Sequence, residues 1–364
     1  MKIIDVSTYL EQLAPRPYQE SYDNAGLLTG SLEQEVTGIL TTLDCTEAVV
    51  DEAIERNCNL IVSHHPIIFR GLKKITGSNY VERTILKAIK NDVAIYAIHT
   101  NLDNVLSGVN RKIADKIGLS NLQILDPKTE TLSKLVTFVP VESKGVVLDA
   151  MHEAGAGQIG EYKNCSFQVE GTGAFFPTEE ASPHIGSTGQ LEQVKEVRIE
   201  VILPVHLESR VIGAMKRAHP YEEVAYYLTR LTNENQEVGS GMIGELGEPI
   251  EPMEFLKRLK EAMELNTIRY TRLSTKPVKK IAVCGGAGSF LLQKAIQKRA
   301  DMFITADFKY HEFFDADGKT TIVDIGHYES EKFTKELLQE ILMKKFPTFA
   351  VNFSKTVTNP VRYL

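Results

Sequence analysis

Two adjacent histidines, His64 and His65, follow a short apolar run and stand directly before a proline. The run 60–63 predicts a buried strand, and Pro66 ends regular strand pairing. Both imidazoles are therefore expected at the edge of a sheet, where α/β proteins usually place their sites. Taken alone, the pair is equally explained by one core histidine and one surface histidine. The interpretation therefore depends on the rest of the chain.

Three further predicted strands also end in groups that bind metals. Asp44 follows one strand, His99 and Asp103 follow another, and His327 and Glu331 follow a third. His327 and Glu331 are four residues apart, so on a helix they share a face. That spacing alone is more common in an exposed helix pair. Together, however, these strand ends predict one site rich in imidazole and carboxylate.

Imidazole and carboxylate without thiolate are suitable ligands for Zn, Mn or Fe(II). They suit a single ion or a pair of ions bridged by a carboxylate. Two metals about 3.5–4 Å apart hold the attacking and leaving oxygens and lower the pKa of a bridging water, which is hydrolytic chemistry. Hydrolysis at a divalent metal centre is thus the chemistry that these residue types favour.

The elements that must position these groups form two similar strand–helix–strand units. The first covers 39–43, 47–56 and 60–63, and its pattern predicts parallel strands. The second, 280–306, matches the first at a constant offset, with Asp307 in the place of His65. The match has two explanations: βαβ units look alike, or two related lobes face a shared site.

The middle of the chain differs in composition from both ends. Residues 126–244 contain two β-α-β-like units, which predict an inserted α+β domain of ferredoxin-like type. We therefore expect an α/β protein with a first lobe at 1–125, this inserted domain, and a second lobe at 245–364. His219 and Glu222 lie in the inserted domain, where a structural role in a turn is favoured over metal binding.

Two loops could contact phosphate groups. The glycine-rich loop 285–289 follows a strand and enters a helix. It is neither G-x-G-x-x-G nor a P-loop, so a tight strand-to-helix turn is the preferred interpretation. The second loop carries the basic residues Arg70, Lys73 and Lys74.

Composition excludes several classes of protein. The 364 residues carry a net charge of −7, which argues against a large basic surface for nucleic acid. No stretch approaches the roughly 18 apolar residues of a membrane span, and the N-terminus lacks the apolar core of a signal peptide. The four cysteines form no C-x-x-C pair and are expected to be reduced thiols. We expect a cytoplasmic protein that does not enter the membrane.

Four motifs in this order resemble a known family over essentially the whole chain. They are Ser63-His64-His65-Pro66, His99-Thr100-Asn101-Leu102-Asp103, Gly241-Met242-Ile243-Gly244-Glu245-Leu246 and Asp324-Ile325-Gly326-His327-Tyr328-Glu329-Ser330-Glu331. They resemble the signatures of the Nif-three-like family, whose members are often labelled GTP cyclohydrolase 1 type 2 homologues. The inserted domain is similar to the PII/CutA-like insert of longer bacterial members.

The resemblance implies a toroidal homohexamer with two divalent metal ions per chain, at sites facing an internal cavity. By motif, His64 and His65 would each bind one metal. Asp103 would join the metal of His65, His327 would join that of His64, and Glu331 would bridge the two.

The family label implies opening of the GTP imidazole ring with release of formate. His99, Asp44 or Glu312 would be candidates to carry protons, and no sequence feature selects GTP over another nucleotide or phosphoester. Two alternatives remain open. One is a non-catalytic metal chaperone or regulatory ring that senses a small molecule through its insert. The other is a nucleic-acid-binding ring, which the acidic composition disfavours.

Overall fold

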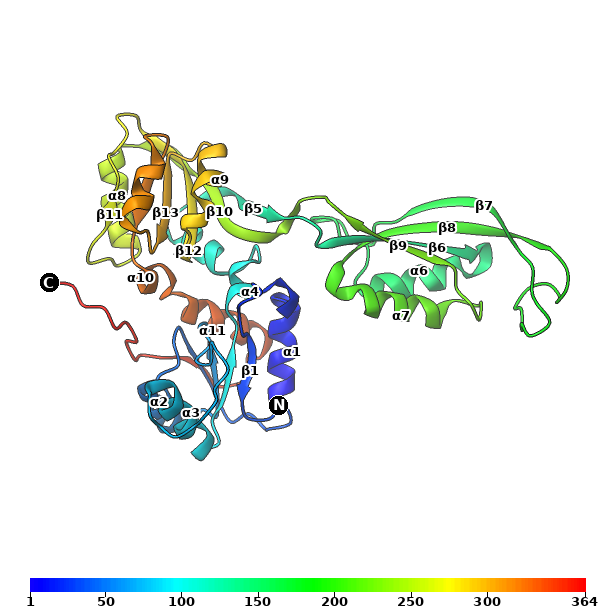
Figure 1. Cartoon of the computed structure of the whole chain (residues 1–364), viewed down its shortest axis with the longest axis horizontal. Helices are drawn as coiled ribbons and strands as arrows, with labels where there is room; N and C mark the ends of the chain where they lie inside the picture. Colours follow the sequence, from blue (N-terminus) through cyan, green and yellow to red (C-terminus); the bar gives the residue numbers. More distant parts are fainter. The chain divides into compact units, whose positions relative to one another are not determined.

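The chain is a mixed α/β protein, as the sequence predicts, and the computed structural model describes all of its 364 residues (Figure 1). It divides into two compact units, residues 1–127 with 238–364, and residues 128–237. We call the second unit the insert. The division of the first unit into two lobes stays a proposal. None of the helices has the length and apolar composition needed to cross a bilayer.

The first sheet has the strand order β1-β4-β3-β2-β15. Its strands are β1 (Gly26–Thr29), β2 (Ile39–Thr42), β3 (Leu60–Ser63), β4 (Ala94–Ala97) and β15 (Val351–Phe353). All neighbouring pairs are parallel except β1 with β4. The strand β15 comes from the C-terminal end of the chain, so this sheet requires both halves of the first unit.

Helices cover both faces of the first sheet. Helices α2 (Glu47–Glu55) and α3 (Tyr80–Lys90) pack on one face, over Leu40, Ile61 and Ile95. Helices α1 (Ile3–Leu13) and α11 (Thr334–Lys345) pack on the other. The Thr46 hydroxyl caps α2 by accepting a hydrogen bond from the Val49 amide, as its position before the helix predicts. Three shorter helices follow: η1 (Arg16–Tyr18), α4 (Thr100–Asp103) and α5 (Val109–Lys116).

The second sheet has the strand order β11-β14-β13-β12-β10-β5. Its strands are β5 (Ser120–Lys128), β10 (Asn235–Ile250), β11 (Arg269–Tyr270), β12 (Val278–Ala287), β13 (Met302–Ala306) and β14 (Thr321–Asp324). The central strands β12, β13 and β14 are parallel. Its helices are α8 (Pro252–Ala262), η4 (Ser289–Leu291), α9 (Leu292–Gln297), η5 (Tyr310–Ala316) and α10 (His327–Glu331).

One hydrophobic core joins the two sheets. Leu60 and Val62 of the first sheet belong to the same buried cluster as Val283 and Ile304 of the second. The sequence predicts one helix from 326 to about 342, but the structure forms two, α10 and α11, with Lys332 and Phe333 between them. The short α10 lies against β12 and β13, and this contact fixes its side chains beside the strand ends.

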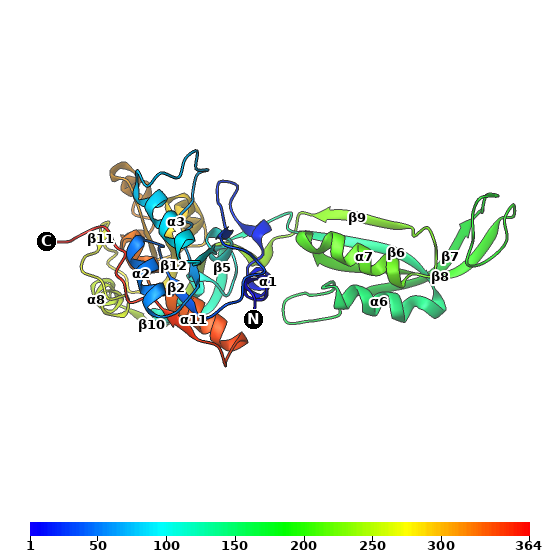
Figure 2. The same ribbon diagram turned by 90° about the horizontal axis from the view of Figure 1, so that it is seen from below.

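The insert has the ferredoxin-like topology that the sequence predicts. Its elements are β6 (Leu132–Pro140), η2 (Val141–Ser143), α6 (Lys144–Glu153), β7 (Phe167–Phe175), β8 (Glu192–Pro204), η3 (Val205–Leu207), α7 (Glu208–Ala218) and β9 (Tyr226–Leu231). The antiparallel strands have the order β7-β8-β6-β9, as expected for two β-α-β units. Both helices pack on one face of this sheet, side by side in Figure 2.

Candidate metal centre

The first sheet brings His64 and His65 to its edge on an extension of β3. Their backbone amides still donate to the Thr42 and Leu43 carbonyls, at 3.0 and 2.9 Å. The Ser63 hydroxyl donates to the His65 carbonyl and tightens the turn before the proline. As a result the two rings do not point to opposite faces, and their centroids are only 5.0 Å apart.

The neighbouring strand β4 supplies His99 and Asp103. The chain leaves β4 at Ile98 and forms the single turn α4, at whose end Asp103 lies. The ring of His99 lies 5.3 Å from the rings of both His64 and His65, centroid to centroid. Parallel strand order thus places two consecutive strand ends at one site, as the sequence predicts.

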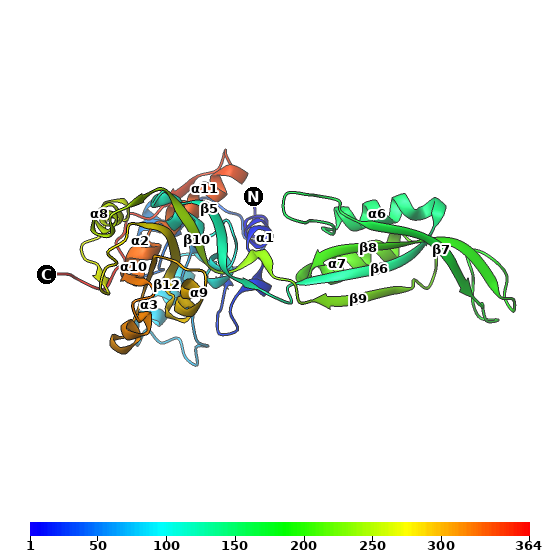
Figure 3. The same ribbon diagram turned by 90° about the horizontal axis from the view of Figure 1, so that it is seen from above.

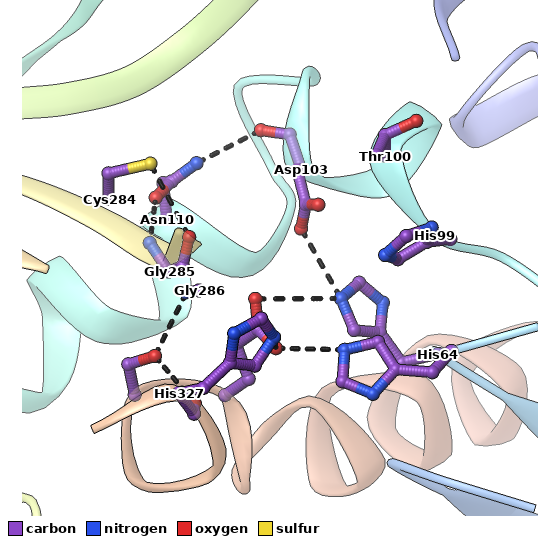
Figure 4. Close-up of polar contacts among 12 residues, drawn as sticks. His64, His99, Thr100, Asp103, Asn110, Cys284, Gly285, Gly286 and His327 are labelled. Carbon is purple, nitrogen blue, oxygen red and sulfur yellow. Dashed lines mark hydrogen bonds and ion pairs between the residues drawn. The ribbon is translucent and has the colours of Figure 1, made fainter. Parts of the chain in front are cut away.

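The second sheet supplies His327 and Glu331 through α10. Gly326 follows β14 with a φ of 89°, a conformation that favours glycine, and it begins this helix. One helical turn separates the two side chains, and Nε2 of His327 lies 3.2 Å from Oε2 of Glu331. Figure 4 shows His327 facing His64, His99 and Asp103.

Glu331 lies at the centre of the cluster. Its Oε2 is 3.0 Å from Nε2 of His65, and its Oε1 is 4.0 Å from Nε2 of His64. The Nε2 of His64 lies 3.4 Å from Oδ1 of Asp103. All five predicted ligands are therefore together. Two trios share Glu331, one with His65 and His327 and the other with His64 and Asp103, and a third possible group joins His64, His65 and His99. The assignment that the family resemblance implies, Asp103 with His65 and His327 with His64, stays a prediction.

Each histidine is held by its Nδ1 atom, which leaves Nε2 for the centre. The acceptors are the Ile98 carbonyl for His64, Asp44 for His65, Asp23 for His99 and Asp307 for His327, at 2.7–2.9 Å. Such partners fix the tautomer and the ring direction of metal-binding histidines. The sequence did not single out Asp23 or Asp307 as partners, because their roles depend on contacts across loops.

Two buried atoms of the centre, Nε2 of His64 and Oδ1 of Asp103, have no hydrogen-bond partner. Burial lowers the pKa of His64 to about 3, against the raising effect of Glu331, so its Nε2 carries a free lone pair. Burial and the charge of Glu331 raise the pKa of Asp103 well above its usual range. A cation between these atoms would satisfy both, so the residues present fit a metal ion.

In the trio of His65, His327 and Glu331, the positive charges of the histidines and the negative charge of the carboxylate stabilise one another. Burial would lower the pKa of His65, but Asp44 and Glu331 raise it to about 10. Burial would also lower the pKa of His327, but Glu331 and Asp307 raise it to about 9. Burial would raise the pKa of Glu331, but His327 and His65 hold it well below its usual range. A metal bound by this trio must therefore displace protons from the histidines.

The glycine-rich loop contacts this centre through its backbone. A Cβ on Gly286 would lie 2.5 Å from Oε1 of Glu331, and the φ of this residue is 60°. The amide of Gly286 donates to the Ser330 hydroxyl, and that of Gly285 donates to the Asn110 side chain (Figure 4). These contacts support the interpretation of the loop as a tight turn that leaves room for Glu331.

Three other residues considered from sequence lie outside the cluster. Glu312 accepts from the Lys309 amide at the start of η5 and belongs to none of the ligand trios. His219 lies in the insert, where Nε2 donates to the Phe138 carbonyl and Nδ1 accepts from the Tyr221 amide. Glu222 is also in the insert and accepts from the Ser182 amide. Both ring nitrogens of His219 are thus engaged with backbone groups, which supports a structural role for this residue over metal binding.

A model of the family described as Duf34/NIF3 (NGG1p interacting factor 3) matches residues 1–360. The chain belongs to this family. A Bacillus subtilis (strain 168) protein named GTP cyclohydrolase 1 type 2 homolog is 41% identical over 360 residues, covering 97% of this chain and 96% of that protein. A Halalkalibacterium halodurans protein of the same name is 42% identical over 374 residues, covering all of both chains.

Solved structures agree with this assignment. A Bacillus cereus protein related to NIF3 superposes with a TM-score of 0.87 at 39% identity, covering 100% of this chain and 99% of that one. A Staphylococcus aureus protein gives a TM-score of 0.80 at 34% identity, with the same coverage. The resemblance found in the four sequence motifs is confirmed, and so is the α/β fold.

In this NIF3-family chain the C-terminal segment also contacts the centre. The carboxylate of Glu52 accepts hydrogen bonds from Ser354, Lys355 and Thr356 and holds the segment beside α2. Further along, the Thr358 hydroxyl donates to Oδ2 of Asp44 at 2.6 Å. Asp44 in turn holds His65, so the C-terminal segment supports a histidine some 290 residues earlier in the chain.

Two features border the centre and could contact a substrate. A cavity of about 520 Å³ opens beside His65 and His327, and Arg269, Tyr328 and Asn359 are among its lining residues. On the His99 side, the half-exposed ring of Phe69 lies 6.2 Å from His99 and 6.1 Å from Tyr22, centroid to centroid. The centre is therefore bordered both by a cavity and by exposed aromatic rings.

Proposed function

We propose that this protein holds two divalent metal ions and uses them to hydrolyse a nucleotide. The protein ligands would be His64, His65, Asp103, His327 and Glu331. The observation that carries the proposal is the position of Glu331. One of its oxygens faces His64, and the other faces His65 and His327. A carboxylate with one oxygen toward each of two ligand sets suits a bridging ligand.

The ligand types agree with Zn, Mn or Fe(II), because imidazole and carboxylate suit all three. Two such ions supply an activated water and a clamp for the attacked group. The protein's part is to fix the ligands, which the four Nδ1 contacts support. The proposal of a second metal ion rests on the trio of His64, Asp103 and Glu331. In this trio Nε2 of His64 and Oδ1 of Asp103 have no hydrogen-bond partner, which supports a cation between them.

His99 is the residue best placed to carry a proton. Burial would raise the pKa of Asp23, but its bonds with His99 and Thr100 lower it to about 2, so Asp23 stays ionised and holds the ring. The other two candidates are engaged elsewhere: Asp44 holds His65, and Glu312 caps η5. We therefore assign proton transfer at the centre to Nε2 of His99.

The relatives' shared name motivates GTP ring opening with release of formate as the reaction to test first. The rings of Tyr22 and Phe69 support an aromatic substrate, because nucleobases stack on such side chains. The nearby residues Arg70, Lys73 and Lys74 would meet its phosphates. We further propose a cytoplasmic homohexamer, and the four free cysteines fit a reducing compartment.

The experiment that tests this proposal is a turnover screen on protein of measured metal content. The protein is reconstituted separately with Zn, Mn and Fe, and is offered GTP, other nucleotides and simple phosphoesters. We expect formate or phosphate release that requires metal and is lost in Glu331→Gln. Two metals per chain without any turnover would favour a metal chaperone or regulatory ring. Less than one metal per chain would contradict both functions.

A further inference from the structure

A cavity of about 700 Å³ lies in the insert, and every residue that lines it belongs to the insert. The helices α6 and α7 cover one face of the insert sheet, and Figure 3 shows no helix on the opposite face, which we call the open face. On β8, Val197, Ile199 and Val201 point into the buried core on the helix side. The alternation of a strand therefore places Glu196 and Arg198 on the open face, where they line the cavity.

Two glycines of β7 leave room beside Glu196. Gly171 stands directly opposite Glu196 in the strand register. A Cβ on Gly173 would lie 2.1 Å from Oε2 of Glu196, so only glycine fits there without moving this carboxylate. Glycine weakens a strand interior, and it commonly marks a position where another group approaches closely. Strand β7 therefore has no side chains at the two positions beside the Glu196 carboxylate, where this group enters the cavity.

The carboxylate of Glu196 has no cationic partner in the chain. The residue is 8% exposed, and its one hydrogen bond comes from the Tyr221 hydroxyl at 2.9 Å. Arg198, the one guanidinium that lines the cavity, pairs with Glu200 instead. Burial and the charge of Glu196 raise the pKa of Tyr221, so its hydroxyl remains a donor. A buried carboxylate without a cation is costly, and a cationic ligand would compensate for its charge.

The other lining groups also favour a cation. Glu170, Glu222 and Glu223 line the same cavity, and no lysine does. Its walls contain two aromatic pairs. The rings of Phe138 and Tyr227 lie 5.6 Å apart, and those of Phe175 and Tyr221 lie 6.1 Å apart, centroid to centroid. The faces of aromatic rings attract ammonium and guanidinium groups.

We propose that the insert binds a small organic cation, an amine with an apolar or aromatic body, in this cavity. Glu196 is the counter-ion, and the aromatic pairs contact the apolar body. The site lies in a different unit from the metal centre, so this proposal does not depend on the hydrolytic function. It gives the insert a ligand of defined chemistry.

The test compares a cation with its neutral isostere on the full-length protein. Benzylamine, which is protonated at pH 7, and benzyl alcohol are titrated separately by calorimetry. We expect one benzylamine per chain, bound about tenfold more tightly than benzyl alcohol, as a desolvated contact of a cation with aromatic rings implies. In Glu196→Gln the preference should disappear, while Glu179→Gln should retain it, because Glu179 is an exposed acid between β7 and β8 that does not line the cavity. Equal affinities in the natural protein, or a preference that survives in Glu196→Gln, would overturn the proposal.

A second variant guards against a folding defect in Glu196→Gln. A Cβ at Gly171 would meet no atom within 4 Å and its φ is not positive, so the strand can accept Gly171→Val, whose side chain would extend into the cavity that Gly171 lines. We expect this variant to keep its circular dichroism spectrum and to lose benzylamine binding. Undiminished binding would place the cation elsewhere and contradict the assignment.

Discussion

The two sheets of the first unit use the same βαβ unit for different purposes at the metal centre. After β3 the first sheet presents His65, and at the matching place after β13 the second sheet presents Asp307, which only holds His327. After β2 the first sheet presents Asp44, and at the matching place the second has Gly286, which makes room for Glu331.

The difference shows how a shared framework can be divided between tasks. Strand ends of the first sheet carry the proposed ligands His64, His65 and Asp103. Strand ends of the second sheet leave space for Glu331 and orient His327, and the proposed ligands of this sheet lie on the short helix α10. A site of this kind requires the two sheets to be held in a fixed position relative to each other, and the hydrophobic core that they share provides this. The predictions below test this division of roles.

The largest effect is expected from Glu331→Gln, because this side chain is the one shared by both trios. The amide cannot offer an anionic oxygen to each of two ions. We expect metal affinity to fall by more than the roughly 10–100-fold that follows loss of an orienting partner. Metal content after dialysis, measured by mass spectrometry, is the readout. Glu340→Gln on the exposed side of α11 is the control, and equal metal content in both variants would exclude Glu331 as a bridge.

Gly286→Ala should be the next most severe change. Its Cβ would meet Glu331, and its positive φ is unfavourable for any residue with a side chain. We expect weaker metal binding and a free energy of unfolding lower by about 1 kcal/mol or more. Gly247→Ala, where no atom lies within 4 Å and φ is not positive, is the matched control in urea unfolding. Unchanged metal affinity would mean that the loop is not shaped around Glu331.

Asp44 and Asp307, the carboxylates that orient His65 and His327, should differ in their effect on metal affinity. Asp44→Asn and Asp307→Asn each weaken the hold on a ligand histidine, with a loss in metal affinity of about 10–100-fold. We expect the larger loss for Asp44, whose side chain is 34% exposed against 50% for Asp307. Competition with a chelator measures both affinities. If Asp307 proved the more important, the second sheet would contribute more than orientation.

A smaller effect is expected from Thr358→Val, which removes the donor to Asp44 and keeps the shape of the side chain. Loss of one hydrogen bond to a charged group costs about 1.5–3 kcal/mol at most, and only part of it reaches the metal through Asp44 and His65. We expect a few-fold loss of metal affinity in the same chelator assay. Thr348→Val, at an exposed position before β15 and close to α1, should show none.

The smallest effect is a pH dependence of the C-terminal segment. Burial would raise the pKa of Glu52, but its bonds with Lys355, Ser354 and Thr356 lower it below the ordinary value of 4.5. Because the pKa of Glu52 is lower in the folded protein, its stabilisation of the C-terminal segment is complete above about pH 4.5. This stabilisation is lost as the pH falls through the pKa of the folded state. Hydrogen exchange at the amides of Lys355 and Thr356, corrected for intrinsic rates, should therefore accelerate below pH 4.5. In Glu52→Gln it should be fast already at pH 7, and slow exchange there would contradict the anchor.

Local sequence predicted much of the framework because local rules control it. The helix that Thr46 caps, the strand before His64 and the ferredoxin-like insert all follow from periodicity, capping and turns. The predicted ligands of the first sheet come together because parallel strands end at the same sheet edge, and the common core brings those of the second sheet to them. The pattern could not predict that the helix after Gly326 would break at Lys332, because packing of α10 against β12 and β13 decides it.

The sequence by itself determined the candidate ligands, the strand ends that carry them and the family of the chain. Only the tertiary structure decided which ligands share a trio, that Asp23 and Asp307 hold histidines, and that Thr358 supports Asp44. It also placed β15 in the first sheet and put Glu196 where a side chain at position 173 would lie. The physical reason is the distance along the chain over which each interaction acts. Periodicity and capping act over a few residues, whereas hydrogen bonds between distant segments depend on how the whole core packs.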